Sequence, residues 1–413
     1  MKKLMTLATV IVAAAANAAL TVADVTARQR WPWNSLVDVD FTVNGDVGEA
    51  YAIDISATAA GGDKKLCATT FATEPIAASG KRSRVVWDLG ADYPNFKADD
   101  LEVTVTATPF SDASSVYLVV DISGGKAASE WPVRYTTVAP VHTAGQNDPC
   151  KTTELWLKRV KAGTIQMGGA DANYNVHTCT LTEDFYLGVF ALTQEQCLNL
   201  WDNRLSKFTN ELYRATRPAD SINNTPLRQP YFSPANPDAA VTSGIVKELR
   251  DRTGLSFDLP TSWQWEYACR AGSTADRYEG CTTSDFRYNG NSKPNSSYEW
   301  YSEQGMWSED YGTSYVDRYK PNPWGFYGML GNVQEVCLDN FMPVDEGSEL
   351  TDPKGSTQEG DSLRSKISKG GAWSDKADLC TASAYRKRDP WTGSNVNFIR
   401  GGRICLTVKK PTE

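Results

Sequence analysis

Apolar and polar residues alternate along several short stretches in the first third of the chain. Residues 37–43 set Val, Val, Phe and Val in turn with Asp, Asp and Thr, and residues 101–106 repeat this pattern with Leu and Val against Glu and Thr. A period of two buries one face of a β-strand and leaves the other face in water. Shorter apolar runs at 51–56, 85–87 and 116–122 predict further strands.

Turn-forming residues separate these runs, at 44–46 (Asn-Gly-Asp), 61–63 (Gly-Gly-Asp) and 124–125 (Gly-Gly). Short strands with regularly spaced turns are typical of an antiparallel sandwich. We therefore predict an all-β, immunoglobulin-like sandwich over residues 19–138. Asp38 and Asp40 could ligate calcium, but their place in the alternation favours the solvated face of the sheet.

The remainder of the chain predicts few helices. Thr193 and Thr261 are each followed three residues later by Gln, which is the capping-box signature of a helix start. A third helix over 245–252 is expected to stop at Gly254. Long stretches without periodicity lie between these helices, and nine of the thirteen Trp residues occur here. Residues 139–150 are rich in Pro, Gly and polar residues and are expected to link the sandwich to a second domain over 151–413.

The first eighteen residues have the composition of a signal peptide. Two Lys residues precede a short apolar run, which ends at the small-residue pattern Ala-Asn-Ala at 16–18. The run is too short to span a bilayer, and no later segment is long and apolar enough to do so. We therefore expect a secreted, periplasmic or cell-surface protein without a transmembrane segment.

The net charge bears on the binding partners of the protein, and the cysteine content bears on its disulfides. The formal net charge of −8 argues against nucleic acid, which needs clustered Lys and Arg. The chain has nine Cys residues, and in an oxidising compartment some of them are expected to form disulfides. Because nine is odd, at least one would stay free or pair outside the chain.

Several motifs, in order, resemble the formylglycine-generating-enzyme (sulfatase-modifying factor) family over residues of about 151–408. The segment 259–272 (LPTSWQWEYACRAG) is very similar to the family's LPTExEWEYA helix, and 321–335 (PNPWGFYGMLGNVQE) is similar to its GLYDMxGNVWE run. The segments 162–168 and 184–188 resemble its opening strands. Residues 369–373 (KGGAW) stand where the family has RGGSW, and Arg403 stands at the end of its GFR motif.

The resemblance implies an irregular α+β domain akin to C-type lectins. Trp263, Trp265, Trp324 and Trp373 are then expected to cover a core built from loops. Glu266, which lies among these aromatic residues, is expected to order loop amides.

The resemblance also implies an activity, the oxidation of a substrate cysteine to formylglycine with oxygen and copper. The family's two active-site cysteines lie five residues apart after the Gly-Gly motif. The second position is Cys380 here, but the first is Asp375, whose carboxylate is a hard ligand that cannot replace a thiolate for Cu(I). The catalytic pair is incomplete and copper binding is disfavoured. Cys380 is expected to be a disulfide half or a buried thiol.

Calcium is a second cofactor that the resemblance implies. The family binds it around the Gly-Asn-Val-x-Glu loop, so Gly331 and Val333 could offer carbonyl oxygens and Glu335 a carboxylate. Gly328 replaces an Asp or Asn of the family, which removes one side-chain ligand. The two His residues, His142 and His177, are too few for a His-based metal site, and His177 is expected to be structural.

These departures favour a non-catalytic binding or surface scaffold with a protein or glycan ligand at the cell surface. Residues 391–397 (WTGSNVN) form a natural recognition stretch. The expected ligand-binding residues are Trp373, Trp391, Asn395, Asn397 and Arg403. The alternative is a formylglycine-generating or related oxidase that activates exported sulfatases. A carbohydrate- or peptidoglycan-associated module is a third reading, supported by export and aromatic residues alone.

Overall fold

The computed structural model describes fourteen stretches of the chain. They are 20–30, 34–46, 48–59, 65–96, 101–110, 115–169, 174–208, 213–222, 224–229, 241–281, 312–356, 366–375, 377–388 and 399–408. The chain divides into two compact units. The N-terminal unit comprises the residues up to Tyr117, with Arg134–Val138 and the residues from Val408 on, and the C-terminal unit comprises Leu118–Val133 and Ala139–Thr407.

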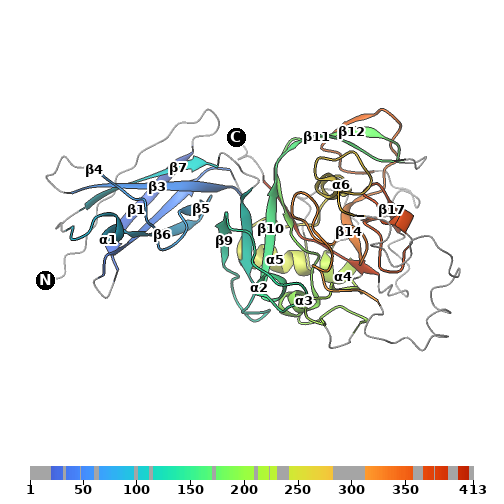
Figure 1. Ribbon diagram of the computed structural model, residues 1–413, viewed down its shortest axis with the longest axis horizontal. Helices are drawn as coiled ribbons and strands as arrows, with labels where there is room; N and C mark the ends of the chain where they lie inside the picture. Colours follow the sequence, from blue (N-terminus) through green and yellow to red (C-terminus); the bar gives the residue numbers. More distant parts are fainter. Residues whose placement is uncertain are drawn as a thin grey trace. The chain divides into compact units, whose positions relative to one another are not determined.

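The N-terminal unit consists of two antiparallel sheets (Figure 1). In the first, β2 (Leu36–Asn44) lies between β1 (Thr21–Gln29) and β6 (Arg82–Asp88). In the second, β3 (Ala50–Ala59) pairs along its length with β7 (Leu101–Pro109). The short strands β4 (Lys65–Cys67) and β5 (Ile76–Ala78) pair with the other edge of β3, and a one-turn helix α1 (Leu89–Asp92) follows β6.

The alternating pattern explains the core of this unit. Val39, Phe41 and Val43 on β2 are fully buried and pack with Trp87 of β6 in one cluster drawn from both sheets. The opposite face of β2 is less exposed than its polarity suggests. Asp38, expected on a solvated face, is only 4% exposed. Three guanidinium groups cover it, with nitrogens at 2.8 to 3.8 Å from its carboxylate, from Arg28, Arg30 and Arg84.

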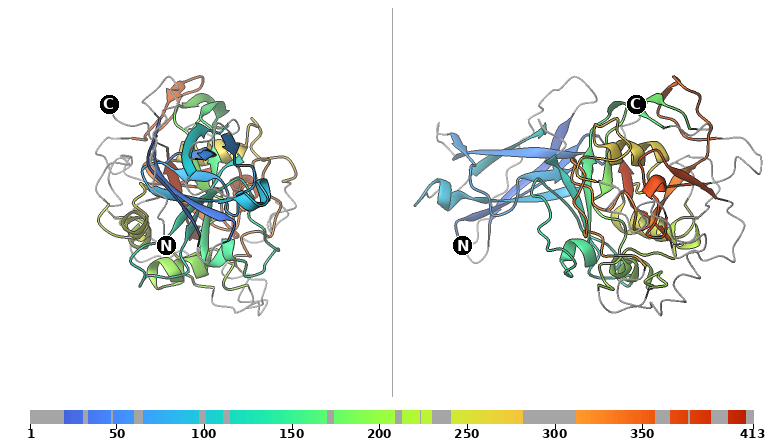
Figure 2. Two further views of the ribbon diagram at one scale, coloured as in Figure 1. Left: turned by 90° about the vertical axis from the view of Figure 1, so that its left-hand side faces the viewer. Right: turned by 45° about the vertical axis from the view of Figure 1, so that its right-hand side comes forward.

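The C-terminal unit contains small sheets and few helices (Figure 2). One sheet orders β19 (Cys405–Thr407), β13 (Phe185–Gly188), β10 (Glu154–Val160) and β8 (Tyr117–Asp121). A second orders β11 (Gly163–Met167), β12 (His177–Leu181) and β15 (Glu349–Thr351). A third orders β17 (Tyr385–Arg388), β16 (Lys366–Lys369), β14 (Gln334–Asn340) and β18 (Arg400–Gly401). The strand β9 (Val133–Thr136) belongs almost entirely to the N-terminal unit. The prediction of a β-rich first region followed by a domain with few helices is thus confirmed.

The strand expected at 116–122 is β8, which falls almost entirely within the C-terminal unit. Directly after it, the Ile122 amide donates to Thr153 O at 2.8 Å. The segment 139–150, expected to be a linker, also has contacts inside this unit. His142 Nδ1 lies 2.9 Å from Asp317 Oδ2, and the Gly145 amide donates to Asp317 Oδ1 at 3.1 Å.

The three predicted helices begin where the sequence predicts, and α5 also ends there. Both capping boxes form, at the start of α3 (Gln194–Trp201) and of α6 (Ser262–Arg270), and α5 (Ile245–Thr253) ends at Gly254 with φ +70°. The short helices α2 (Pro149–Thr152) and α4 (Asn224–Leu227) lie beside α3 and α5, whereas α6 packs against β11, β14 and β16 (Figure 1). A 3₁₀ turn, η3, spans Ala377–Leu379.

Glu266 of α6 holds loops of the C-terminal unit in place, as its position among aromatic residues predicted. Its fully buried carboxylate accepts a hydrogen bond from the Gly168 amide (2.9 Å) and another from the Tyr174 hydroxyl (3.0 Å). Two cations, Arg270 (2.8 Å) and Lys369 (2.9 Å), neutralise its charge. Burial raises the pKa of Glu266, but Lys369 and Arg270 outweigh burial and hold this pKa at about 2.

This depressed pKa predicts acid sensitivity of the C-terminal unit. The ordinary pKa is 4.5, so ionised Glu266 stabilises the folded state fully above this pH, and the stabilisation is lost as the pH falls from 4.5 towards 2. We expect Glu266→Gln to lower the urea midpoint at pH 7 and to flatten its fall between pH 4.5 and 2. Glu279→Gln, at an exposed carboxylate, is the control. An unchanged slope in Glu266→Gln would contradict this account.

Candidate functional site

A tight turn after β16 brings the candidate catalytic positions together. Gly370 and Gly371 have φ values of +87° and +71°, which side chains rarely adopt. A Cβ atom on Gly370 would lie 2.4 Å from Met329 O, and one on Gly371 would lie 2.6 Å from Cys380 Sγ. Only glycine therefore lets the chain pass between these neighbours and turn towards Asp375.

The Asp375 carboxylate is an anchor for this turn. Its Oδ2 accepts hydrogen bonds from Gln334 Nε2 and from the Ala372 amide, both at 2.9 Å. Its Oδ1 forms an ion pair with Arg386 Nη2 at 3.1 Å. Both oxygens are thus engaged, one by the start of β14 and its own turn, the other by β17.

Cys380 lies directly behind the turn. It is fully buried, and its Sγ is 3.9 Å from Ala372 O. Burial, with a smaller contribution from the neighbouring Asp375 charge, raises the pKa of the Cys380 thiol to about 12. The thiolate is the nucleophile and the metal-binding form of cysteine, so this sulfur is a protonated thiol at neutral pH.

These residues do not fit a Cu(I) centre. Such a centre needs soft thiolate ligands. The position beside Cys380 carries a carboxylate whose oxygens are already bonded to Gln334, Arg386 and an amide. No group of three or more His, Cys, Asp or Glu able to hold a metal occurs among the described residues.

Glu335 has been expected to ligate calcium, but its carboxylate is bonded to Arg403. Both side chains are fully buried, with Arg403 Nη2 2.7 Å from Oε1 and Arg403 Nε 2.9 Å from Oε2. Trp265 Nε1 donates to Oε2 as well, at 2.7 Å. A calcium ion would have to displace a buried guanidinium, so this carboxylate does not fit the role.

Gly331 and Val333, the two expected carbonyl ligands, lie in the turn that leads into β14. The Gly331 amide donates to Gly370 O at 2.7 Å, and Val333 is 1% exposed. In the same turn Asn332 has φ +64°, and its side chain exchanges hydrogen bonds with the backbone of Ser314 (2.9 and 3.0 Å). The Gly-Asn-Val motif is thus a structural turn that is bonded to Gly370 on one side and to Ser314 on the other.

Of the five expected ligand-binding residues, the structure describes two. Trp391, Asn395 and Asn397 lie outside the described residues. Trp373 is 7% exposed and meets Phe208 edge-on, with ring centroids 5.5 Å apart. Arg403 is fully buried, and besides Glu335 it donates to the carbonyl oxygens of Gly188, Val189 and Tyr327. The guanidinium of Arg403 is thus bonded to groups inside the unit.

The two partners of Asp375, Gln334 and Arg386, were not predicted. Gln334 stands where the family has Trp, and Arg386 follows Cys380 by six residues, but neither spacing indicates a contact with Asp375. The substitution of an apolar Trp by Gln was the available signal, since a buried amide needs a hydrogen-bonding partner.

The nine cysteines, all among the described residues, form no disulfide, contrary to expectation. Seven are buried, and the sulfurs of Cys337, Cys380 and Cys405 lie near backbone or side-chain oxygens. Cys337 Sγ lies 3.7 Å from Glu335 O, and Cys405 Sγ lies 3.7 Å from Gln264 Oε1. His142 and His177 also lie apart, the second in β12 with Nδ1 2.8 Å from Asn175 O.

Comparison with known proteins decides the family. Residues 145–400 match the model of the sulfatase-modifying factor enzyme 1-like domain. The chain belongs to this family. The segment with the closing turn, Asp375 and Cys380 lies within the matched residues, so the site described here is part of the sulfatase-modifying-factor domain.

Individual relatives are distant. The chain is 31% identical over 137 residues to the formylglycine-generating enzyme of Mus musculus, covering 32% of this chain and 32% of that protein. It is 27% identical over 263 residues to the serine/threonine-protein kinase pkn1 of Chlamydia pneumoniae, covering 60% of this chain. The match spans 37% of the kinase, so the chain covers about a third of the length of each of these relatives.

Among solved structures, variable protein 1 of Treponema denticola is similar, with a TM-score of 0.45 and 20% identity. The match covers 66% of this chain and all of that chain. Within the described residues of the present chain, no helix is both long and apolar enough to cross a membrane.

The protonated state of Cys380 predicts slow alkylation. In the native protein at pH 8 we expect iodoacetamide to modify the exposed Cys67 first and to leave Cys380 unmodified until the C-terminal unit unfolds. Peptide mass spectrometry over time measures both sites, and labelling in guanidinium chloride is the control for intrinsic reactivity. Labelling of native Cys380 as fast as Cys67 would contradict a buried thiol.

The Glu335–Arg403 ion pair predicts a large loss of stability without any calcium dependence. Glu335→Gln leaves a buried guanidinium uncompensated, which costs about 3–5 kcal/mol. We expect the unfolding transition to move equally in calcium and in EGTA. If the variant does not fold, the natural protein is measured instead. A melting temperature several degrees higher in calcium than in EGTA would show that this domain binds calcium and would contradict the prediction.

Proposed function

We propose that this chain is an exported binding protein whose sulfatase-modifying-factor domain serves as a ligand-holding scaffold and not as an oxidase. In this proposal the domain has a C-type-lectin-like fold, and the N-terminal strands form an immunoglobulin-like sandwich. The ligand is a protein or glycan at the cell surface. Export follows from the expected signal peptide at 1–18, which lies outside the described residues.

The proposal depends on one observation, which is that both oxygens of the Asp375 carboxylate are bonded within the domain. Where an oxidase of this family has its first active-site cysteine, this chain has a carboxylate that accepts from Gln334 and Ala372 and pairs with Arg386. Gln334 and Arg386 complement an acid and would not stabilise a second thiol. Asp375, Gln334 and Arg386 therefore complement one another. Their polar contacts hold the turn where the thiol has been lost.

Buried ion pairs brace the scaffold. Glu266 and Glu335, both fully buried, are neutralised by Lys369, Arg270 and Arg403. Ion pairs of this kind position loops only when all their hydrogen-bonding groups are satisfied. Such a frame supports binding loops at its surface.

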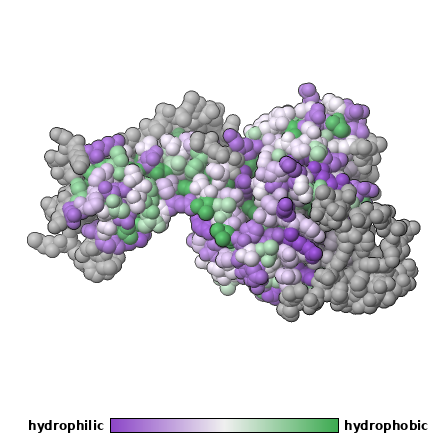
Figure 3. Space-filling view, viewed as in Figure 1, coloured by the Kyte–Doolittle hydropathy of each residue, from purple (hydrophilic) through white to green (hydrophobic). Residues whose placement is uncertain are grey.

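The surface favours a polar ligand. In the view of Figure 3 the described surface of the C-terminal unit is largely hydrophilic, with hydrophobic residues scattered over it. Scattered apolar residues are normal on a protein surface, whereas a contiguous patch marks an apolar partner. Proteins and glycans bound through hydrogen bonds suit this face.

The test is an aerobic assay of the full chain with Cu(I) and a Cys-x-Pro-x-Arg peptide, read by mass spectrometry for formylglycine. We expect no conversion by the natural protein, because one thiol of the pair is absent and Cys380 is protonated. Asp375→Cys is assayed beside it, with Asp375→Ala as the matched control that removes the carboxylate without adding sulfur.

Conversion by the natural protein would overturn the proposal and make this chain an oxidase. Conversion by Asp375→Cys alone would support it, since the missing thiol is then the cause of inactivity. Failure of all three, with each variant folded by circular dichroism, also supports a binding scaffold, because changes besides Asp375 then prevent oxidation.

A further inference from the structure

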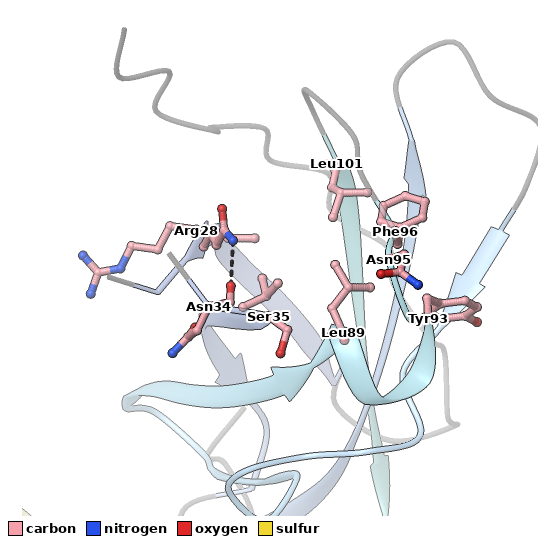
Figure 4. Close-up of a pocket in the computed structure, with 12 residues that line it drawn as sticks. Arg28, Asn34, Ser35, Leu89, Tyr93, Asn95, Phe96 and Leu101 are labelled. Atoms are coloured by element: carbon pink, nitrogen blue, oxygen red, sulfur yellow. Dashed lines mark hydrogen bonds between the residues drawn. The ribbon is translucent and has the colours of Figure 1, made fainter. Parts of the chain in front are cut away.

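The N-terminal unit contains a cavity of about 350 Å³ that the proposed function does not use (Figure 4). It lies where β1 ends, β2 begins and helix α1 leads towards β7. Its walls come from Ala27–Gln29, Asn34, Ser35, Val37, Leu89, Gly90, Tyr93, Asn95, Phe96 and Leu101. Ligand pockets in proteins have volumes of about 300–1,000 Å³ with mostly apolar walls and a few polar groups.

The floor of the cavity is part of the hydrophobic core. Ala27, Val37 and Leu101 are 5–8% exposed and belong to the buried cluster of this unit, against which Leu89 and Phe96 also pack. An apolar cavity of about 150 Å³ is large enough to take up benzene. The larger space here, with Leu89, Leu101 and Phe96 beside it, fits an apolar ring system.

The rim supplies fixed hydrogen-bonding groups. Gln29 Nε2 donates to Asn34 O at 2.6 Å, which joins the end of β1 to the chain entering β2 (Figure 4). Asn34 Oδ1 accepts from the Leu36 amide at 3.0 Å. Asn95, with φ +63°, stands on the side of Phe96. Amide and hydroxyl groups placed on two sides of an apolar space suit a ligand with a polar, uncharged edge.

The charges around the cavity exclude an ionic ligand from its interior. Arg28 is the one basic or acidic residue among its described lining residues. The guanidinium of Arg28 extends away from Leu89 and Leu101 in Figure 4, and its Nε lies 3.5 Å from Asp38 Oδ2. Nearby Asp88 accepts from Ser35 Oγ (3.3 Å) and from the Ala91 amide (3.0 Å). A charge buried here would therefore lack a counter-ion.

From the volume, the apolar floor, the amide rim and the missing counter-charge, we propose that this cavity binds a small uncharged molecule with an apolar ring system and a hydrogen-bonding edge. The site is independent of the C-terminal unit and of its proposed function, because all of its lining residues belong to the N-terminal unit.

The experiment titrates the full chain with 2-naphthol by isothermal titration calorimetry and compares it with 2-naphthoate, which has the same rings and a charged edge. We expect saturable one-site binding of 2-naphthol, and at least about tenfold weaker binding of 2-naphthoate, because its carboxylate would be desolvated without a partner. No saturable binding, or equal affinity for both probes, would overturn the proposal.

Two variants locate the site. Ser35→Trp fills the cavity from the start of β2 and should weaken 2-naphthol binding at least about tenfold, because the indole occupies the space of the probe. Asn44→Trp is the matched control, since it adds the same side chain at the exposed other end of β2 and should leave the affinity unchanged.

If Ser35→Trp does not fold, Leu89→Asn makes the floor polar and tests the same space. Its half-exposed position in a short helix tolerates the change, and circular dichroism checks the fold. Affinity for 2-naphthol that survives both folded variants would place the probe elsewhere and refute this site.

Discussion

The ion pair between Glu335 and Arg403 is the interaction on which the C-terminal unit depends. Arg403 lies near the end of the described chain, yet its guanidinium reaches β14 through Glu335, the end of β13 through the carbonyl oxygens of Gly188 and Val189, and the loop at Tyr327. Trp265 joins α6 to the same carboxylate. A domain with few helices and short strands has little regular hydrogen bonding to fix its loops, and a buried charged centre with every group satisfied does this work.

The site around Asp375 builds on this centre. Gln334 precedes Glu335 directly, so the ion pair that fixes the start of β14 also positions the amide that Asp375 accepts from. The turn at Gly370 and Gly371 then places Cys380 behind the carboxylate, away from water. The same arrangement that fixes the turn therefore leaves the Cys380 thiol buried and protonated.

Local features were predictable from the sequence, and distant pairings were not. Capping boxes, the glycine stop of α5 and the alternation in β2 depend on neighbouring residues, so the sequence predicts them correctly. The role of Glu266 was inferred from its aromatic surroundings. Arg403, the partner of Glu335, lies 68 residues away along the chain, and Gln334, a partner of Asp375, lies 41 residues away. Spacing indicates neither contact, so the burial of Arg403 and its pairing with Glu335 could not be predicted from the sequence.

Seven buried cysteines that form no disulfide set a condition on how this chain reaches its folded state. In the native protein, burial keeps sulfurs such as Cys380 from reacting, but an unfolded chain exposes all of them to oxidants. Oxidation and folding then compete as rates, and a cross-link formed early would trap a non-native arrangement. If the protein is exported as proposed, the burial of these sulfurs must outpace oxidation, or a catalyst of disulfide reduction must correct the errors.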